Sequence, residues 1–397
     1  MKLIKLFIVL SVLFVAQPLL AQNDTPEKVH SIVYVRKDFD WYTKQYELWK
    51  KELSKNKKDP ASWMNLLTAA RMAKLTSPDS DTRKLWKNNE LNSFDGFEKQ
   101  IKGSYEYWIL KRWKAFIDWD DVDNPDELKE RRMKIQEYCL NAYKMDPNRP
   151  DVYGNLLNFF MEEGNEEKSR EIAEKWMASG DITYSLYAMN YNTLVSCHEN
   201  AILFTQGDND SYPSWVLQYA KNVRTDVTVI NIWLAHSNRE YRNTIFKAAK
   251  IPAMANNPES KDMIIDHVLE NLGERELCFA PNFAISNYDS LAEKVYNVGA
   301  ALVYSENDFN NSSLLVYNFE NKYLLDHLTS DIQYEEWPEK AKEANFNYIS
   351  GLFTLLQHYY LTQQHPKLKY TKEMIMKIVE GTKYGEEILG HLDFYTL

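Results

Sequence analysis

One stretch near the middle of the chain reads as a strand, a tight acidic loop, a helix and a second strand, and this order constrains the fold most. Residues 201–205 form an apolar run of the buried-strand type, and residues 227–234 are rich in β-branched side chains. Between them lies a turn cluster, residues 207–211, and Pro213 suits the first turn of a helix over 212–221. Two strands around one helix make a βαβ unit, whose crossover is almost always right-handed.

Polar side chains follow three of the predicted strands. Asp208, Asn209 and Asp210 come after the first strand, His236 after the second, and Asn282 after a third strand at 277–280. Ligands of open α/β sheets gather at the carboxyl ends of strands. Two carboxylates, an imidazole and two amides could hold a divalent cation or bind the hydroxyl groups of a sugar, so these five residues are the candidate ligand-binding set.

The same loop also has a purely structural interpretation, and we take that as the expectation. Asp210 or Ser211 would cap the helix, Asp208 would stabilise the turn, and Gly207 would supply a backbone shape that a side chain forbids. The chain has no ligand spacing of the EF-hand or paired-histidine type, no Gly-x-Ser-x-Gly elbow and no phosphate-binding glycine loop. We therefore predict no metal, no cofactor and no catalytic residue.

This part of the chain resembles a known family. Residues 201–231, 262–271 and 276–280 are similar to the soluble region that follows the membrane half of the protein O-mannosyltransferase-like membrane proteins of Bacteroidota, a domain of unknown function. The family residues that the chain keeps are Gly207, Asp208, Asn209, Asp210, Pro213, Trp215, Arg224, Asp226, Val227, Phe279 and Ala280. Ser214 replaces an apolar family residue, and the family's Asp-Trp-Tyr after the second strand is missing. The resemblance implies kinship and not an activity.

The first 21 residues read as a secretory signal peptide. Lys2 and Lys5 precede an apolar stretch over 6–16, and Ala21 ends a suitable cleavage site before Gln22. The stretch is shorter than the ~20 residues of a membrane span, and Pro18 interrupts the segment after it. No cysteine lies behind it that could carry a lipid. We expect a soluble periplasmic protein, cleaved after Ala21 and without an integral membrane segment.

Charge and cysteine content exclude several classes of protein. A net charge of −10 argues against a nucleic-acid partner, because phosphate binding needs a basic surface. Cys139, Cys197 and Cys278 are too few and too scattered for a disulfide framework or a zinc site. One pair could oxidise in the periplasm and would leave one thiol over, but the expectation is three buried free cysteines.

The pattern before residue 190 is that of helical hairpins. Residues 131–178 fit the tetratricopeptide pattern, with Tyr153, Leu156 and Phe160 on the first helix of a repeat, Gly164 at the turn, and Trp176 on the second helix. A weaker match starts near residue 59. Such helices bury their apolar stripes on neighbouring hairpins, so several must stack.

Strand-like runs at 201–205, 227–234, 277–280 and 300–304 alternate with helical patterns at 212–221, 241–250, 261–272 and 290–297. This alternation predicts a three-layer, Rossmann-like α/β domain with a mainly parallel sheet. The predicted organisation is a signal peptide (1–21), a tetratricopeptide-like helical domain (22–190), the α/β domain (191–308) and C-terminal helical hairpins (309–397).

The function predicted from these features is that of a non-enzymatic interaction or scaffold protein of the cell envelope. Its helical repeats would bind a periplasmic or envelope protein or a peptide. The alternative is a glycan-binding or enzymatic accessory of envelope glycosylation, with its site at the loop from Gly207 to Asp210. The sequence leaves the partner and the oligomeric state open.

Overall fold

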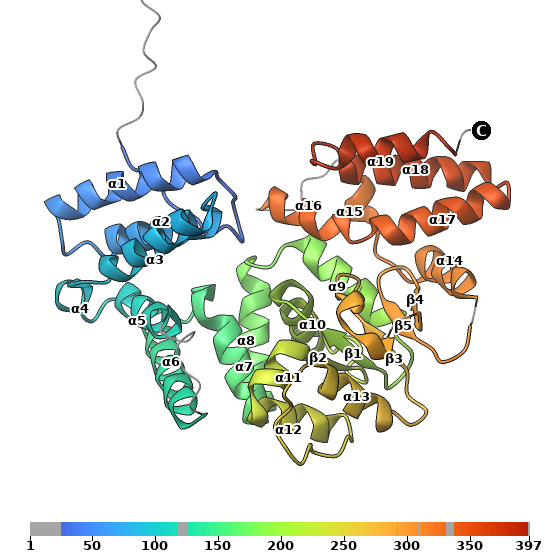
Figure 1. The fold of residues 1–397 in the computed structure, drawn as a ribbon, viewed down its shortest axis with the longest axis horizontal. Coiled ribbons are helices and arrows are strands. Elements are labelled where there is room, and N and C mark those ends of the chain that lie inside the picture. The colour runs from blue at the N-terminus through green and yellow to red at the C-terminus, as the bar shows by residue number, and fades with distance from the viewer. Residues whose placement is uncertain (1–24, 118–124, 292, 309, 331–336, 396–397) are drawn as a thin grey trace, which may run out of the picture. The chain divides into compact units, whose positions relative to one another are not determined.

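The computed structural model describes residues 25–117, 125–291, 293–308, 310–330 and 337–395 (Figure 1). The described residues divide into two compact units, 25–31 with Lys37–Lys102, and Ile32–Arg36 with the described residues from Gly103 onward. Most of the described chain is helical, with one small sheet in the second unit. No helix of the described residues is long and apolar enough to cross a membrane. The signal peptide predicted at residues 1–21 lies outside the described residues. The four-part division predicted from the sequence stays a prediction.

The first unit is a small helical bundle. Its helices are α1 (Phe39–Lys55), α2 (Pro60–Thr76), α3 (Ser80–Ser93) and α4 (Phe97–Gln100). Asp38, Asp59 and Asp79 cap α1, α2 and α3, each accepting backbone N–H groups of the first turn. Phe97 is fully buried with Trp63 against it, so the aromatic side chains form the core of this unit.

The second unit begins with five helices. They are α5 (Tyr105–Ile117), α6 (Pro125–Met145), α7 (Tyr153–Glu162), α8 (Glu166–Ser179) and α9 (Tyr184–Ser196). Gly164, with a φ of 65°, lies in the turn between α7 and α8, where the repeat pattern places a glycine. Tyr153, Leu156 and Trp176 are buried between these helices. Helical hairpins are therefore present, and their tetratricopeptide class remains a prediction.

The sheet has five strands in the order β2-β1-β3-β5-β4. The strands are β1 (Ile202–Thr205), β2 (Thr228–Asn231), β3 (Leu277–Phe279), β4 (Val295–Asn297) and β5 (Leu302–Tyr304). β1 pairs in parallel with β2 and β3, whereas β5 is antiparallel to both β3 and β4. The sheet is mixed, so the prediction of a mainly parallel sheet was wrong.

The reason lies in the connection after β3. A parallel strand needs a crossover of a dozen or more residues that is usually helical. Here only two 3-10 turns follow, Ile285–Asn287 and Asp289–Leu291, and the chain then forms the hairpin of β4 and β5. The helix predicted over 290–297 is consequently wrong, because Val295–Asn297 is a strand.

Four helices belong to the first half of the sheet: α10 (Asp208–Lys221), α11 (Ile232–Ser237), α12 (Arg239–Ala248) and α13 (Asp262–Glu270). The second strand is shorter than the predicted 227–234 because Asn231 starts α11. Its side chain accepts hydrogen bonds from the backbone N–H groups of Trp233 and Leu234 at 3.0 Å each. The strand therefore ends where a helix cap appears.

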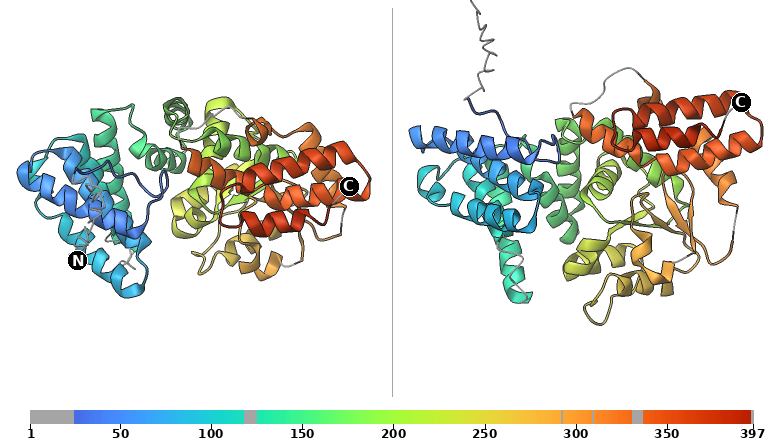
Figure 2. Two further views of the ribbon diagram at one scale, coloured as in Figure 1. Left: turned by 90° about the horizontal axis from the view of Figure 1, so that it is seen from above. Right: turned by 45° about the horizontal axis from the view of Figure 1, so that its top comes forward.

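The C-terminal part is helical again: α14 (Asn311–Asn321), α15 (Asp326–Thr329), α16 (Pro338–Phe346), α17 (Ile349–Leu361), α18 (His365–Val379) and α19 (Gly385–Leu392). In Figure 1 and in the right view of Figure 2 the last of these helices, orange to red, lie along the top of the α/β part. Leu352, Leu356 and Ile375 share one buried cluster with Met189 of α9 and Ala300 beside the sheet. The neighbouring helix α16 packs directly on α9.

Candidate functional site

The loop between β1 and α10 is organised by Asp210. Gly207 precedes the first residue of the helix, and the Asp210 carboxylate reaches back to accept the backbone N–H groups of Gly207 at 2.7 Å and Gln206 at 3.0 Å. Asp210 is therefore the third helical residue, which satisfies the N-terminal donors from inside the helix. Burial raises the pKa of Asp210 to about 6, although the hydrogen bonds from Gln206 and Gly207 oppose this shift.

The polar residues behind this loop bond to one another. The hydroxyl groups of Thr205 and Ser211 lie 2.6 Å apart, and Asn231 donates from Nδ2 to the Ser211 hydroxyl at 2.8 Å. All three residues are buried. They join the end of β1, the first turn of α10 and the end of β2. Their side chains therefore hold these three elements together.

Pro213 lies in the second turn of α10, later than the first turn predicted for it. A proline has no N–H, so the carbonyl of Asn209, four residues earlier, loses its helical partner. Asn190 of α9 replaces that partner by donating from Nδ2 to the Asn209 carbonyl at 2.9 Å. Its Oδ1 accepts the Ser214 hydroxyl at 2.7 Å. These contacts fix the loop to α9 from the outside.

A small pocket of about 200 Å³ opens at this end of the sheet. It lies between α9, the start of α10, the segment after β3, and α16. The lining residues are Leu186, Met189, Asn190, Thr193, Asn209, Asp210, Pro281, Asn282, Glu343, Ala344 and Asn347. The structure thus brings Asn209, Asp210 and Asn282 of the predicted set together, while Asp208 and His236 are not part of this lining.

Asp208 faces a different neighbour, Lys340 of α16. The Asp208 side chain is exposed, but the surrounding protein raises its pKa and the charge of Lys340 opposes that rise. Lys340 is buried, and its ammonium group packs over the Tyr34 ring at 5.2 Å. Burial lowers the pKa of Lys340, against the charges of Asp181 and Asp208.

Asp181 itself is held by two donors. The Tyr34 hydroxyl donates to one carboxylate oxygen and Trp176 Nε1 to the other, both at 2.8 Å. Nothing in the sequence pattern points to Lys340 or Asp181, because they belong to helical regions far from the loop along the chain. Their proximity to Asp208 follows from the packing of α16 on α9.

His236 lies near the end of α11. Its backbone carbonyl accepts a hydrogen bond from Arg242 Nη1 at 3.3 Å, and the ring atom Nε2 is buried without a hydrogen bond. Arg242 is almost fully buried and also donates to the Ala235 carbonyl at 2.6 Å. The histidine therefore belongs to the packing of α11 and α12 and does not join the loop residues.

The pocket keeps several polar groups that the fold does not use. The side-chain amides of Asn209, Asn282 and Asn347 and the carboxylate of Glu343 make no hydrogen bond to the described protein residues. By contrast, Thr193 and Asp210 are committed to backbone groups. Amide groups both donate to and accept from hydroxyl groups, and a carboxylate accepts from them, so the unused part of the lining suits a small polar ligand.

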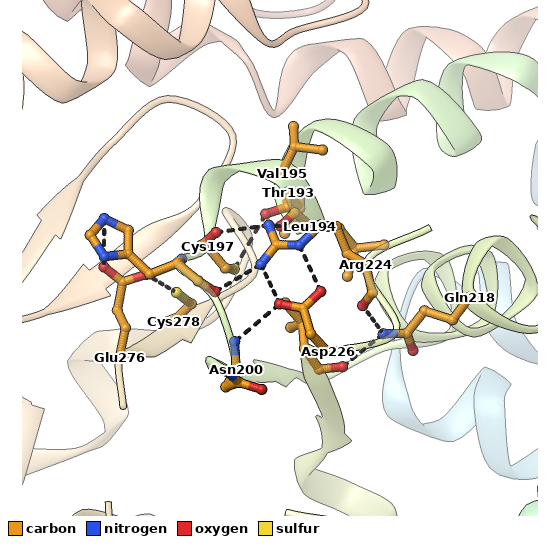
Figure 3. Close-up of polar contacts among 12 residues, drawn as sticks. Thr193, Leu194, Val195, Cys197, Asn200, Gln218, Arg224, Asp226, Glu276 and Cys278 are labelled. Atoms are coloured by element: carbon orange, nitrogen blue, oxygen red, sulfur yellow. Dashed lines mark hydrogen bonds and ion pairs between the residues drawn. The ribbon is translucent and has the colours of Figure 1, made fainter. Parts of the chain in front are cut away.

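The opposite end of β1 is fixed by Arg224. Its guanidinium group donates to the carbonyls of Leu194, Cys197 and His198, each at 2.8 Å (Figure 3). It also forms two hydrogen bonds with Asp226, at 2.9 and 2.8 Å. A cation at the carbonyl end of α9 is favourable for the helix dipole. Arg224 and Asp226 therefore form a structural clamp.

Asp226 completes this clamp. Its Oδ2 accepts the backbone N–H of Asn200 at 3.0 Å, and the hydrogen bonds from Arg224 lower its pKa. An open depression of about 550 Å³ lies beside it, lined by Cys197, His198, Glu199, Arg224, Asp226 and Lys322. Among the described residues, no group of three His, Cys, Asp or Glu side chains could hold a metal ion.

A comparison with protein families places a known domain over this region. The model of the TMEM260-associated domain 2 matches residues 186–269, which contain α10, β1, β2 and most of α9 and α13. The match includes both the loop at Asp210 and the clamp at Arg224, and covers less than half of the chain. It is consistent with an O-mannosyltransferase-like associated domain of unknown function. No curated protein matches the chain.

Proposed function

We propose that this is a non-enzymatic binding protein whose C-terminal helices hold a protein or peptide partner. The observation that carries the proposal is a group of exposed apolar side chains at the end of α17 and after α19. Leu361 is 70% exposed and Phe394 is 75% exposed. The Tyr360 ring lies 6.2 Å from that of Phe394 and 5.5 Å from that of Tyr395. We call Tyr360, Leu361, Phe394 and the partly buried Tyr395 the aromatic patch.

An exposed patch of this kind costs solubility unless something covers it. Aromatic side chains dominate the binding energy of many interfaces because they bury a large area at a small entropic cost. Further exposed side chains lie on α18 and at α19, namely Tyr370, Met376, Tyr384 and Leu389. The polar side chains of Thr205, Asp210, Ser211 and Asn231, by contrast, are bonded within the fold, which favours binding over catalysis.

Charge substitutions in the aromatic patch test this proposal. Leu361→Glu and Phe394→Glu should reduce the proteins that co-purify with the tagged full chain from envelope fractions by tenfold or more. Met133→Glu is the matched control, because Met133 is 61% exposed on α6, away from the patch in sequence. All variants should keep the wild-type unfolding midpoint. Recovery of the same proteins in the same amounts with Leu361→Glu would contradict the proposal.

A second candidate function is the binding of a sugar at the strand-end pocket. The uncommitted amides of Asn209, Asn282 and Asn347 favour it, since hydroxyl groups need both donors and acceptors. A volume of about 200 Å³ is below the usual range for drug-sized ligands and suits one small polar group. Asn282→Ala and Asn347→Ala should abolish a monosaccharide-dependent thermal shift, whereas Asn321→Ala on α14 should not. Absence of any shift in the wild type removes this candidate.

Export belongs to the same proposal. The signal peptide predicted at residues 1–21 would deliver the protein to the periplasm, where the Bacteroidota kinship and the tetratricopeptide-like hairpins predicted from the sequence would suit an envelope scaffold. Intact-mass measurement of the native protein should give a chain that begins at Gln22. A retained leader would contradict this part of the proposal and leave the aromatic patch unaffected.

A further inference from the structure

Two of the three cysteines meet in the second unit although they are far apart in the sequence. Cys197 follows the last residue of α9, and Cys278 is the central residue of β3. The two side chains are buried, and one carboxylate oxygen lies beside both residues (Figure 3). Glu276 Oε2 accepts the Cys278 thiol at 3.1 Å and the backbone N–H of His198, the residue after Cys197, at 2.8 Å. Two separate elements thus bring Cys197 and Cys278 to the same part of the interior.

In the reduced state these thiols have only weak or unfavourable partners. The Cys197 thiol donates to the Thr193 carbonyl at 3.4 Å, and the Cys278 thiol donates to Glu276 Oε2 at 3.1 Å. Burial and the neighbouring Cys197 and Glu276 raise the pKa of Cys278 well above its usual range. A buried polar group with a poor partner costs free energy, which bonding of the two sulfur atoms would remove.

The third cysteine has a different environment. Cys139 lies on α6, is fully buried, and interacts with the guanidinium group of Arg112. Burial raises its pKa to about 11. Of the three cysteines only Cys197 and Cys278 are neighbours, so Cys139 is the one without a cysteine partner.

We propose that Cys197 and Cys278 form a disulfide when the chain meets a disulfide oxidant, and that Cys139 stays a free thiol. Such a crosslink would join the end of α9 to the middle of the sheet, next to the carbonyls that Arg224 clamps. It would close a loop of roughly 80 residues, and long closed loops restrict the unfolded chain most. This inference is independent of the proposed function, because it concerns the interior and not the aromatic patch.

The oxidant is a small disulfide such as oxidised glutathione, or the disulfide of a thiol oxidoreductase. Cys197 lines the open depression beside Arg224, whereas Cys278 is completely buried, so the exchange starts at Cys197. The Cys197 thiolate attacks one sulfur of the oxidant, whose other sulfur leaves as a thiol. The Cys278 thiolate then attacks Cys197 and releases the second thiol. One S–S bond is broken and one is formed, and the two protons of the cysteines end on the oxidant.

The test uses the reduced full chain in two arms. One arm is incubated with oxidised glutathione in buffer, and the other in buffer with sub-denaturing urea, which opens buried sites transiently. Both are then denatured in N-ethylmaleimide and weighed. We expect one maleimide on the protein and a linked peptide pair containing Cys197 and Cys278. Three maleimides in both arms, or a crosslink through Cys139, would overturn the proposal.

Matched variants sharpen the result. Cys139→Ser should carry no maleimide and keep the crosslink, and its oxidised form should unfold at a higher urea concentration than its reduced form. Cys197→Ala combined with Cys278→Ala should show no oxidant-dependent shift of the unfolding midpoint. An oxidant-dependent shift of the same size in this double variant would also overturn the proposal.

Discussion

Asn190 donates a hydrogen bond from Nδ2 to the backbone carbonyl of Asn209 at 2.9 Å, and this contact replaces the one that Pro213 removes from α10. The same Nδ2 also donates to the Leu186 carbonyl of its own helix at 2.8 Å. Asn190 is only 2% exposed. The proline inside α10 and the asparagine on α9 are therefore linked, because Asn190 supplies the donor that Pro213 lacks.

Asn190→Ala should destabilise the protein by about 2–3 kcal/mol, because it leaves the Asn209 carbonyl without a donor. Pro213→Ala restores a backbone N–H that can bond to that carbonyl. In this background the stability loss caused by Asn190→Ala should shrink by about 1 kcal/mol. Urea unfolding of the wild type, the two single variants and the double variant measures this difference. Asn321→Ala, on an exposed part of α14, is the control and should stay within about 0.5 kcal/mol of wild type. Equal losses in the two backgrounds would contradict the coupling.

The local parts of this region could be predicted from the sequence. Strands β1, β2, β3 and β5 and helices α10, α12 and α13 follow from runs and periodicities that span a few residues. The capping role of an acid three residues after Gly207 also had a sequence signal, since an N-terminal donor pair and an acid at this spacing form a known helix start. The prediction named Asp210 or Ser211 as the capping residue, and the structure has the Asp210 carboxylate in that role, from the third helical position with Gly207 at the N-cap.

The remaining features depend on long-range packing. Residues 290–297 have the composition of either a helix or a strand, and only the pairing of β4 with β5 decides between them. That hairpin sets the direction of half of the sheet. Lys340 joins Asp208 because α16 packs on α9, which no local pattern encodes. For the same reason the meeting of Cys197 and Cys278 was one open alternative among several pairs.

Asp210 should make stability depend on pH in a specific direction. Burial raises its folded pKa from 3.8 to about 6, so the folded state prefers the protonated acid. The protonated acid stabilises the folded protein by roughly 3 kcal/mol at a pH below the pKa that Asp210 has in the unfolded chain. This stabilisation is lost as the pH rises through about 6. Asp210→Asn should remove this loss between about pH 4 and pH 7, and urea unfolding at several pH values measures it.

Two controls make the result for Asp210 specific. Glu162 has a pKa raised to about 7, mainly by burial, so its titration overlaps and the comparison belongs in a Glu162→Gln background. Asp210→Ala should cost about 1–3 kcal/mol below about pH 4, because the N–H groups of Gln206 and Gly207 lose their acceptor, and this cost should shrink as the pH rises through about 6. An unchanged pH dependence in Asp210→Asn would show that the acid is charged throughout.

Arg224→Lys should be strongly destabilising although it keeps the charge. The guanidinium group makes five hydrogen bonds, three to carbonyls at the end of α9 and two to Asp226. An ammonium group has three donors and no planar fork, so it can satisfy only part of this set. We expect a loss of about 2–4 kcal/mol, because this partly buried network is left with acceptors that have no donor. Arg170→Lys, at an exposed site, should cost less than about 1 kcal/mol in the same urea titration.

Two glycines should differ strongly in how much stability they lose on substitution by alanine. Gly207 has a φ of −137°, an extended shape open to any residue, and an added Cβ would lie 3.5 Å from Asp210 Oδ1, an ordinary contact. The expectation that this glycine is required by its backbone shape is therefore wrong, and Gly207→Ala should cost less than about 1 kcal/mol.

Gly299 is the contrasting case. Its φ is 115°, and a Cβ would lie 2.5 Å from the Tyr323 hydroxyl. That hydroxyl cannot withdraw without losing its hydrogen bonds with the Ala300 N–H at 2.8 Å and with Ser196 at 2.6 Å. Backbone strain and the clash together should cost about 3 kcal/mol or more in Gly299→Ala. Thermal unfolding of the two variants side by side measures the contrast, and a Gly207→Ala loss as large as that of Gly299→Ala would mean that the loop before α10 tolerates no side chain at all.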